Sequence, residues 1–338
     1  MNDVLTPILA RLTRRADLEP AEIDAAVTEI LEGRVSDVQA AGFIVAWRTK
    51  GETTEELTAL VHTMLRYATL IEGAPAEAID TCGTGGDRAG TINVSTIATL
   101  IAVGAGATVV KHGNRAASSQ CGSADVLEAL GVPIELDAAA VARCVEQARV
   151  GFCFAPKYHP ALRFLGPARR ALGVATTFNF LGPLLNPARV TRQVIGVSDP
   201  EMAERMLRVL AAHGTTRAIA VHGDDALDEL STTTTSRLHE LVDDEVRTTK
   251  VDPAELGIEL VDLEQLRGGD AESNAKVVRA VLDGEAGPAR DIGVLNAAVA
   301  LIVADLATDL ADGVARASAA IDSGAAAEAL TRWIEVAS

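Results

Sequence analysis

The chain has 338 residues, of which 48% are hydrophobic and 3% aromatic, and its formal net charge is −17. These values predict one large or two moderate globular domains, and they argue against a disordered chain and against base-stacking surfaces. The negative charge also argues against a nucleic-acid partner, because a polyphosphate backbone would be repelled. We expect no membrane span and no signal peptide, and the four cysteines form no C-x-x-C pair, which is typical of reduced thiols in a cytoplasmic protein.

The first 75 residues show only helical patterns. Apolar residues recur three and four positions apart in 19–33, 36–51 and 53–71, and the first two of these segments end at a glycine. Ser36 and Thr53 stand where helix-capping residues are expected. The sequence therefore predicts a small all-helical domain over residues 1–75.

From residue 76 to 338 the pattern changes to strands that alternate with helices. The predicted strands are 77–80, 107–113, 150–156, 192–198 and 217–223. Such alternation predicts an α/β domain with a mainly parallel sheet, whose ligands bind beyond the carboxyl ends of the strands. We further expect a hairpin at 236–251, helices from 272 to 337, and a helical return to the first domain at about 159–190, where Gly-Pro steps break the pattern.

Two loops at predicted strand ends have the composition of phosphate-binding loops. The stretch "GTGGDRAGTINVST" (83–96) combines glycines with hydroxyl and amide side chains, and "KHGNRAASSQCGSAD" (111–125) combines cations with hydroxyls at a helix start. Either loop alone could be an ordinary helix-capping loop. Two of them at one edge of a sheet favour a ligand rich in phosphate.

Acidic side chains crowd a third strand end. Asp224, Asp225, Asp228 and Glu229 lie within "HGDDALDEL" (222–230). A solvated acidic turn would explain this stretch by itself, but next to phosphates the same carboxylates suit magnesium, which binds one or two carboxylates together with phosphate oxygens. A bound cation, or sugar hydroxyls, would also explain why the glycine loop carries the anion Asp87.

Seven stretches together resemble anthranilate phosphoribosyltransferases, the family that catalyses the second step of tryptophan biosynthesis. They are "GTGGD", "NVST", "KHGNRAASS", "GSADVLEALG", "FAPKYHPAL", "FNFLGPLLNP" and "LDEL". The resemblance covers nearly the whole chain. It implies a nucleoside-phosphorylase-like fold, with a small helical domain and a large α/β domain in a homodimer. It also implies that the amine of anthranilate displaces pyrophosphate from C1 of phosphoribosyl pyrophosphate, with two magnesium ions.

The resemblance also implies the residues of each site. Those for phosphoribosyl pyrophosphate are Gly83, Gly86, Asp87, Thr91, Asn93, Val94, Ser95, Thr96, Lys111, His112, Gly113, Asn114, Arg115, Ala116, Ala117, Ser118, Ser119 and Ser123. Those for anthranilate are Gly83, His112, Asn114, His159 and Arg169, and those for magnesium are Ser95, Asp228 and Glu229. No general base is implied, because the aryl amine is already a neutral nucleophile. Lys111 and Arg115 are candidates for stabilising the leaving group's charge.

Two positions depart from the family pattern. Ala175 stands where the family has an arginine, and Ala226 stands where it has a glycine. Either change could alter the anthranilate channel or the flexibility of the acidic loop. Two alternatives stay open at this point: an enzyme resembling pyrimidine nucleoside phosphorylases, and a non-catalytic paralogue of the same fold.

Overall fold

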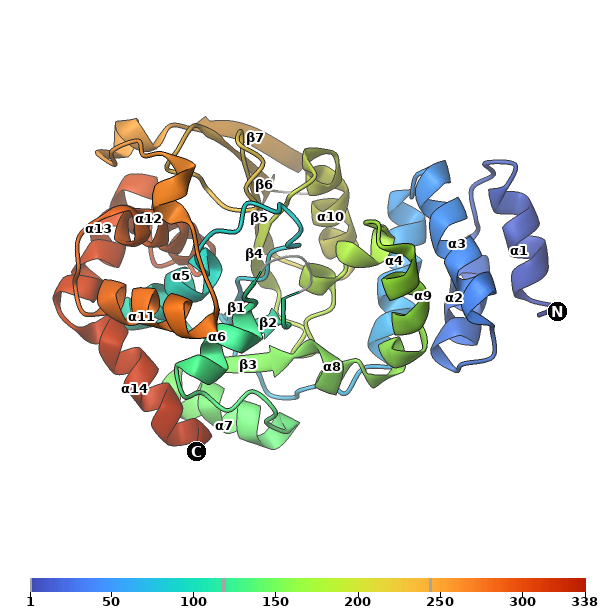
Figure 1. Cartoon of the computed structure of the whole chain (residues 1–338), viewed down its shortest axis with the longest axis horizontal. Helices are drawn as coiled ribbons and strands as arrows, with labels where there is room; N and C mark the ends of the chain where they lie inside the picture. Colours follow the sequence, from blue (N-terminus) through green and yellow to red (C-terminus); the bar gives the residue numbers. More distant parts are fainter. Residues whose placement is uncertain (1, 117–119, 243–244) are drawn as a thin grey trace.

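The computed structural model describes residues 2–116, 120–242 and 245–338. Within them, one seven-stranded sheet has the order β3-β2-β1-β4-β5-β6-β7 (Figure 1). The strands are β1 (Ile79–Asp80), β2 (Val109–Gly113), β3 (Val150–Phe154), β4 (Arg192–Gly196), β5 (Arg217–Gly223), β6 (Ser236–Val242) and β7 (Glu245–Val251). Strands β1 to β5 pair in parallel, while β6 and β7 form an antiparallel hairpin at the edge. The predicted mainly parallel sheet and hairpin are thus confirmed.

Four helices form a separate layer at the N-terminal end of the molecule, drawn in blue in Figure 1. They are α1 (Leu5–Leu12), α2 (Pro20–Leu31), α3 (Asp37–Lys50) and α4 (Thr54–Arg66). The predicted caps are present, because the hydroxyl of Ser36 accepts a hydrogen bond from the backbone N–H of Gln39, and that of Thr53 from the N–H of Glu56. The N-terminal helical bundle is thus confirmed.

A buried carboxylate holds this helical layer together. Glu56 accepts hydrogen bonds from the backbone N–H of Leu18 (2.7 Å) and the indole N–H of Trp47 (2.8 Å), and it pairs with the ammonium of Lys50 (2.9 Å). A buried charge is tolerated when each of its oxygens has such partners. One side chain of α4 thereby fixes α3 and the loop before α2.

The segment 155–190 returns to the helical layer. It contains α8 (Ala155–Tyr158), three short 3-10 helices (Pro160–Phe164, Thr177–Asn179 and Gly182–Leu184) and α9 (Gly166–Leu172). Helix α9 packs on α3, and the first 3-10 helix packs on α2. This packing agrees with the predicted helical return. The border between two domains near residue 75 stays a prediction.

One guanidinium connects the helical layer to the sheet. Arg48 of α3 pairs with Glu52 and with Asp199, each at 3.1 Å, and stacks on the ring of Phe180. The hydroxyl of Thr177 donates to the buried carboxylate of Glu52. These contacts fix Asp199, three residues after β4, and the 3-10 turn at 177–179 to the C-terminal end of α3.

The other helices surround the sheet (Figure 1). They are α5 (Val94–Gly104), α6 (Ser123–Ala129), α7 (Ala138–Ala148), α10 (Pro200–Ala212), α11 (Ala271–Leu282), α12 (Pro288–Val303), α13 (Leu310–Asp322) and α14 (Ala325–Ala337). Helices α5 and α12 pack against each other, and both are buried along most of their length, which explains their apolar sequences. In the described parts of the chain, no helix is both long and apolar enough to cross a membrane.

Asp80 joins three segments at the end of β1. Its side chain is buried and accepts hydrogen bonds from the backbone N–H groups of Thr81 (2.7 Å) and His112 (3.0 Å) and from the amide of Asn186 (2.8 Å). The Asn186 amide also donates to the carbonyl of Val110, at 2.7 Å. Strands β1 and β2 and the end of the returning segment therefore meet at one carboxylate.

Burial gives Asp80 a stability that depends on pH. It raises the pKa of Asp80 to about 6, although the Lys111 ammonium and the three N–H donors oppose the shift. The folded chain therefore keeps this proton at pH values where the unfolded chain has lost it, so stability present below the ordinary pKa of 3.8 is lost as the pH rises through about 6.

We expect Asp80→Asn to remove this titration. The unfolding free energy of the wild type relative to the variant should fall by about 3 kcal/mol over the whole window, roughly 1 kcal/mol of it between pH 5 and 7. Urea unfolding of both proteins at a series of pH values measures the difference. Parallel pH curves for the two proteins would show that Asp80 does not carry the proton.

Candidate functional site

The ammonium of Lys111 lies in the centre of the predicted site. Lys111 is buried in the middle of β2, where its Nζ donates to the carbonyl of Thr81 (2.7 Å) and the hydroxyl of Ser95 (3.2 Å). Asp80 and Glu229 are the nearby carboxylates whose charges act on it. A buried cation between two loops predicted to bind phosphate has the charge that such a ligand requires.

The acidic segment packs directly beneath the glycine loop. The carboxylate of Asp228 accepts a hydrogen bond from the backbone N–H of Gly85, at 2.7 Å. A Cβ atom added at Gly83 would meet that carboxylate at 2.7 Å, and one added at Gly196 would meet the Asp228 carbonyl at 1.7 Å. Glycine is required at Gly196 because the backbone carbonyl of Asp228 approaches too closely for any side chain, whereas a side chain at Gly83 would displace the Asp228 carboxylate from its place under the loop.

The two adjacent carboxylates are electrostatically unfavourable in this environment. Burial raises the pKa of Asp228, and the charge of nearby Asp87 raises it further. Burial, followed by the charge of Asp228, raises the pKa of Glu229 well above its ordinary value, although the Ser95 N–H donates to its carboxylate. In the described part of the chain, no group of three or more His, Cys, Asp or Glu side chains could hold a metal ion by itself. A cation here would need further ligands, such as phosphate oxygens or water.

The start of α5 brings several predicted residues together. Asn93 precedes the helix, Val94 and Thr96 are buried within its first turn, and Ser95 contacts Lys111. The Thr96 hydroxyl is buried and has no hydrogen-bond partner among the described residues. The first N–H groups of a helix suit anions, a feature that the sequence predicted for the second loop and that the structure adds to this one.

The second loop is partly outside the described residues, which exclude Ala117, Ser118 and Ser119. The carbonyl of Asn114 accepts hydrogen bonds from the hydroxyl of Ser123 (3.3 Å) and the N–H of Ala124 (3.1 Å). The guanidinium of Arg115 pairs with Asp125 at 2.9 Å and with Glu128, both on α6. In this conformation the charge of Arg115 is offset by the two α6 carboxylates, while the Lys111 ammonium lies beside the glycine loop.

Two buried histidines lie edge to face beside the site, with ring centroids 5.2 Å apart. His112 Nδ1 contacts the carbonyl of Gly182 (2.7 Å), and His159 Nε2 contacts the carbonyl of Leu185 (2.9 Å). A carbonyl only accepts, so each of these nitrogens carries the hydrogen. Burial lowers the pKa of His112 to about 3 and that of His159 to about 4.

Each neutral ring therefore has a second nitrogen with a free lone pair. His112 Nε2 and His159 Nδ1 are both buried, and neither has a hydrogen-bond partner in the described ranges. Because unsatisfied buried acceptors are costly, they are suited to a ligand that donates N–H groups.

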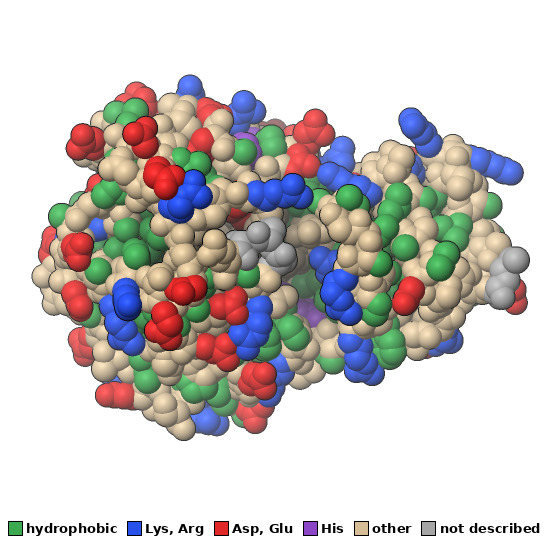
Figure 2. All heavy atoms as spheres, in the orientation of Figure 1, with side chains coloured by type: hydrophobic (Ala, Val, Ile, Leu, Met, Phe, Trp, Pro, Cys, Tyr) green, Lys and Arg blue, Asp and Glu red, His purple; other side chains and the backbone are tan. Residues whose placement is uncertain are grey.

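Arg169 is the half-buried cation of α9. Burial lowers its pKa, and no described carboxylate counters that effect. Its neighbour Arg170 is exposed and its guanidinium lies near Gly166. Figure 2 shows a hollow between the helical layer and the sheet-bearing part, with Lys and Arg side chains beside it. An anionic group fits this side of the hollow.

The departures from the family pattern have different structural settings. Ala175 is exposed, so a longer side chain there has no packing role in this chain. Ala226 has a φ angle of 71°, in the left-handed region where glycine is favoured. Alanine at this position costs about 1 kcal/mol, and the acidic turn tolerates it because the side chain is exposed.

Sequence reasoning missed four residues that organise this region. They are Asp80, Asn186, Ser198 and Asn274. The hydroxyl of Ser198 donates to the carbonyl of Gly85 (2.9 Å), and its backbone N–H donates to Thr84 (3.1 Å). Asp80 ends a predicted strand and Asn186 lies in a quoted stretch, which were usable signals. Ser198 likewise ends a predicted strand, 192–198, whereas Asn274 has no local signal.

Two family profiles together match most of the chain. Residues 6–68 match the helical bundle domain of a glycosyl transferase family, and residues 75–327 match the a/b domain of that family. Among curated relatives, the anthranilate phosphoribosyltransferase of Nocardioides sp. is 51% identical over 332 residues and is covered to 97%, as is this chain. That of Alkaliphilus metalliredigens is 47% identical over 326 residues, with 96% of both chains covered.

Solved structures agree with these matches. The anthranilate phosphoribosyltransferase of Thermus thermophilus has a TM-score of 0.91 and 38% identity, over 97% of this chain and 98% of that one. The enzyme of Saccharomyces cerevisiae, solved in complex with PRPP and Mg, has a TM-score of 0.92 and 25% identity, over 100% of this chain and 98% of that one. The chain thus belongs to the anthranilate phosphoribosyltransferases of this glycosyl transferase family.

Proposed function

We propose that the protein transfers the phosphoribosyl group of phosphoribosyl pyrophosphate to the amine of anthranilate, in tryptophan biosynthesis. The observation that carries the proposal is the meeting of the glycine loop, the Lys111 ammonium and the Asp228–Glu229 pair at the carboxyl end of the parallel strands. An anionic donor needs cations and N–H groups there, and the acidic pair needs a metal.

The donor site is proposed to comprise the glycine loop, the start of α5 and the loop after β2. Magnesium fits beside Asp228, Glu229 and the Ser95 hydroxyl, because a cation would favour the ionised form of carboxylates that burial disfavours. Two ions are proposed, one near Ser95 and one near the acidic pair. When bound, magnesium supplies positive charge against the phosphates, and the Lys111 ammonium adds to it as pyrophosphate leaves.

The acceptor site is proposed to lie towards α9. The guanidinium of Arg169 would pair with the carboxylate of anthranilate, and Asn114 would line the site. The free lone pairs of His112 and His159 would accept N–H groups of the amine. In the reaction the amine nitrogen forms a bond to C1, the bond from C1 to the pyrophosphate oxygen breaks with its electron pair on that oxygen, and the nitrogen then loses a proton to the departing pyrophosphate or to water. The main contribution of the protein is to hold the two reactants close.

The first prediction concerns turnover itself. Anthranilate is fluorescent, so we expect its emission to decrease when phosphoribosyl pyrophosphate and magnesium are added to the protein. Omission of either addition is the control. A folded protein that leaves the fluorescence unchanged in the complete mixture would contradict the proposed function.

The second prediction concerns the acidic pair. Asp228→Asn with Glu229→Gln should reduce turnover on the order of 100-fold or more, because the variant cannot bind the metal that opposes the charge of the leaving group. Magnesium titrations of kcat measure the effect. Asp224→Asn is the matched control, because Asp224 lies on the same turn but is exposed and is held by Thr235. Wild-type rates in the double variant at every magnesium concentration would contradict the metal assignment and would show that Asp228 and Glu229 only form a solvated turn.

The third prediction separates the two substrates. Arg169→Ala should raise the KM for anthranilate about 10- to 100-fold, since one charge-assisted hydrogen bond is lost, and should leave the KM for phosphoribosyl pyrophosphate nearly unchanged. Arg170→Ala is the control, because its side chain is exposed and points about 100° away on the helix. Equal effects of the two substitutions on the KM for anthranilate would show that anthranilate does not bind at this segment.

Three further features are proposed. A homodimer through the helical layer is supported by Val38 and Val45 of α3, which are 82% and 39% exposed and lie seven residues apart on one side of the helix. Light scattering would test the homodimer.

A cytoplasmic location and the division into domains at residues 1–75 and 76–338 stay predictions.

A further inference from the structure

Asn274 lies in the first turn of α11, far in sequence from the predicted site residues. It is buried, and its Oδ1 accepts the backbone N–H of Gly269 at 2.8 Å. Its Nδ2 donates to Oδ1 of Asn93 at 2.8 Å, and Nδ2 of Asn93 donates to the carbonyl of Cys121 at 3.2 Å. Three hydrogen bonds thus run in series through two amide side chains.

The direction of this series is fixed at both ends. A backbone N–H can only donate, so the Asn274 atom that faces Gly269 is its oxygen. The Asn274 nitrogen therefore faces Asn93, which must present its own oxygen in return. The nitrogen of Asn93 is then left to meet the carbonyl of Cys121, which only accepts. Neither amide can turn over without placing donor against donor or acceptor against acceptor.

The series joins the segments that form the proposed donor site. Asn93 precedes α5, and Cys121 ends the loop before α6. The backbone around Gly269 is itself attached to the glycine loop, because Gly268 N–H donates to the Gly90 carbonyl (2.8 Å). Ile92 N–H donates in the same way to the carbonyl of Leu266 (3.0 Å). Hydrogen bonds therefore fix both predicted phosphate loops to the start of α11.

We propose that Asn274 is a positioning residue for phosphoribosyl pyrophosphate, which acts by fixing the Asn93 amide and the separation of the two phosphate loops. The proposal rests on the proposed function. None of its contacts reaches α9, so the anthranilate side of the site should not depend on it.

Asn274→Asp tests the direction of the series at constant size. A carboxylate can still accept from Gly269 but cannot donate to Asn93, and it repels the Asn93 oxygen. We expect the KM for phosphoribosyl pyrophosphate to rise about tenfold or more, with the KM for anthranilate unchanged. Inhibition by added pyrophosphate should weaken in the same proportion. Asn274→Ala, which removes the series without burying a charge, serves if the first variant does not fold.

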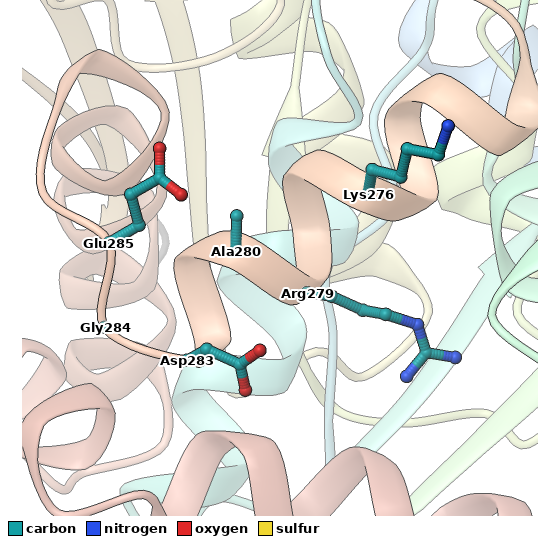
Figure 3. A pocket seen from close by; sticks show the side chains of 6 residues that line it. All are labelled: Lys276, Arg279, Ala280, Asp283, Gly284 and Glu285. Atoms are coloured by element: carbon teal, nitrogen blue, oxygen red, sulfur yellow. The ribbon is translucent and has the colours of Figure 1, made fainter.

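Lys276→Ala is the matched control. Lys276 is exposed two residues further along α11, where it lines a shallow hollow with Arg279, Ala280 and Asp283 (Figure 3). Wild-type constants are expected for this variant.

Calorimetric titration with phosphoribosyl pyrophosphate and magnesium separates this proposal from the proposed function, since it needs no turnover. Weaker binding by both Asn274 variants, measured well below the Tm of each variant, supports the positioning role even if anthranilate is not the acceptor. Unchanged binding by both variants, or an equal rise of both KM values, overturns it. A wild type that fails to bind the donor overturns both.

Discussion

The structure depends on the way three N–H donors converge on the buried carboxylate of Asp80. Two of these donors are backbone groups, one directly after β1 and one on β2, and the third belongs to Asn186, over a hundred residues further along the chain. The carboxylate therefore sets where β1 ends relative to β2 and holds the returning segment against both. The Asp80 carboxylate thus connects three segments by hydrogen bonds, and its buried negative charge has to be offset by these donors and by the Lys111 ammonium.

The hydrogen bonds of Asp80 and Asn186 also help to place Lys111 and the two buried histidines. Lys111 follows Val110, whose carbonyl is held by Asn186, so its ammonium is directed towards Thr81 and Ser95. The carbonyls of Gly182 and Leu185 lie a few residues before Asn186, and they decide which nitrogen of each histidine carries hydrogen. The position of the segment before Asn186 therefore decides which nitrogen of His112 and of His159 carries the hydrogen. The net charge of −17 has little bearing on them, because distant charges are screened.

Local sequence patterns were sufficient for much of the fold. Alternating strand and helix patterns, the capping residues Ser36 and Thr53 and the hairpin at 236–251 each depend on interactions within a few residues. The strand β1 is shorter than the predicted 77–80, because only Ile79 and Asp80 have ladder partners, Ile79 on both β2 and β4 and Asp80 on β4.

The site was predictable only in part for the same reason. The glycine loop, the loop after β2 and the acidic turn are visible as composition. The hydrogen bonds that orient them join residues such as Asn93 and Asn274, or Gly85 and Asp228, at sequence separations of 181 and 143. A buried asparagine in an amphipathic helix has the same local pattern whether or not it contacts a site. The ion pairs of Arg115 with α6 were equally invisible, because a cation in a polar loop gives no indication of which anion it will meet.

Arg48, Glu52 and Thr177 join the segment that carries Arg169 to α3, so the proposed acceptor and donor sites are held by different parts of the molecule. The groups proposed to hold the donor lie on the sheet and its loops, whereas the segment with Arg169 packs on α3 and is held by the Arg48 guanidinium at the end of that helix and the Glu52 carboxylate just after it. On the proposed placement of the two substrates, substitutions in the helical layer would change the choice of amine and leave the groups at the ribose in place. The contacts of Arg48, Glu52 and Thr177 would then be the constraint that any such change of acceptor has to keep.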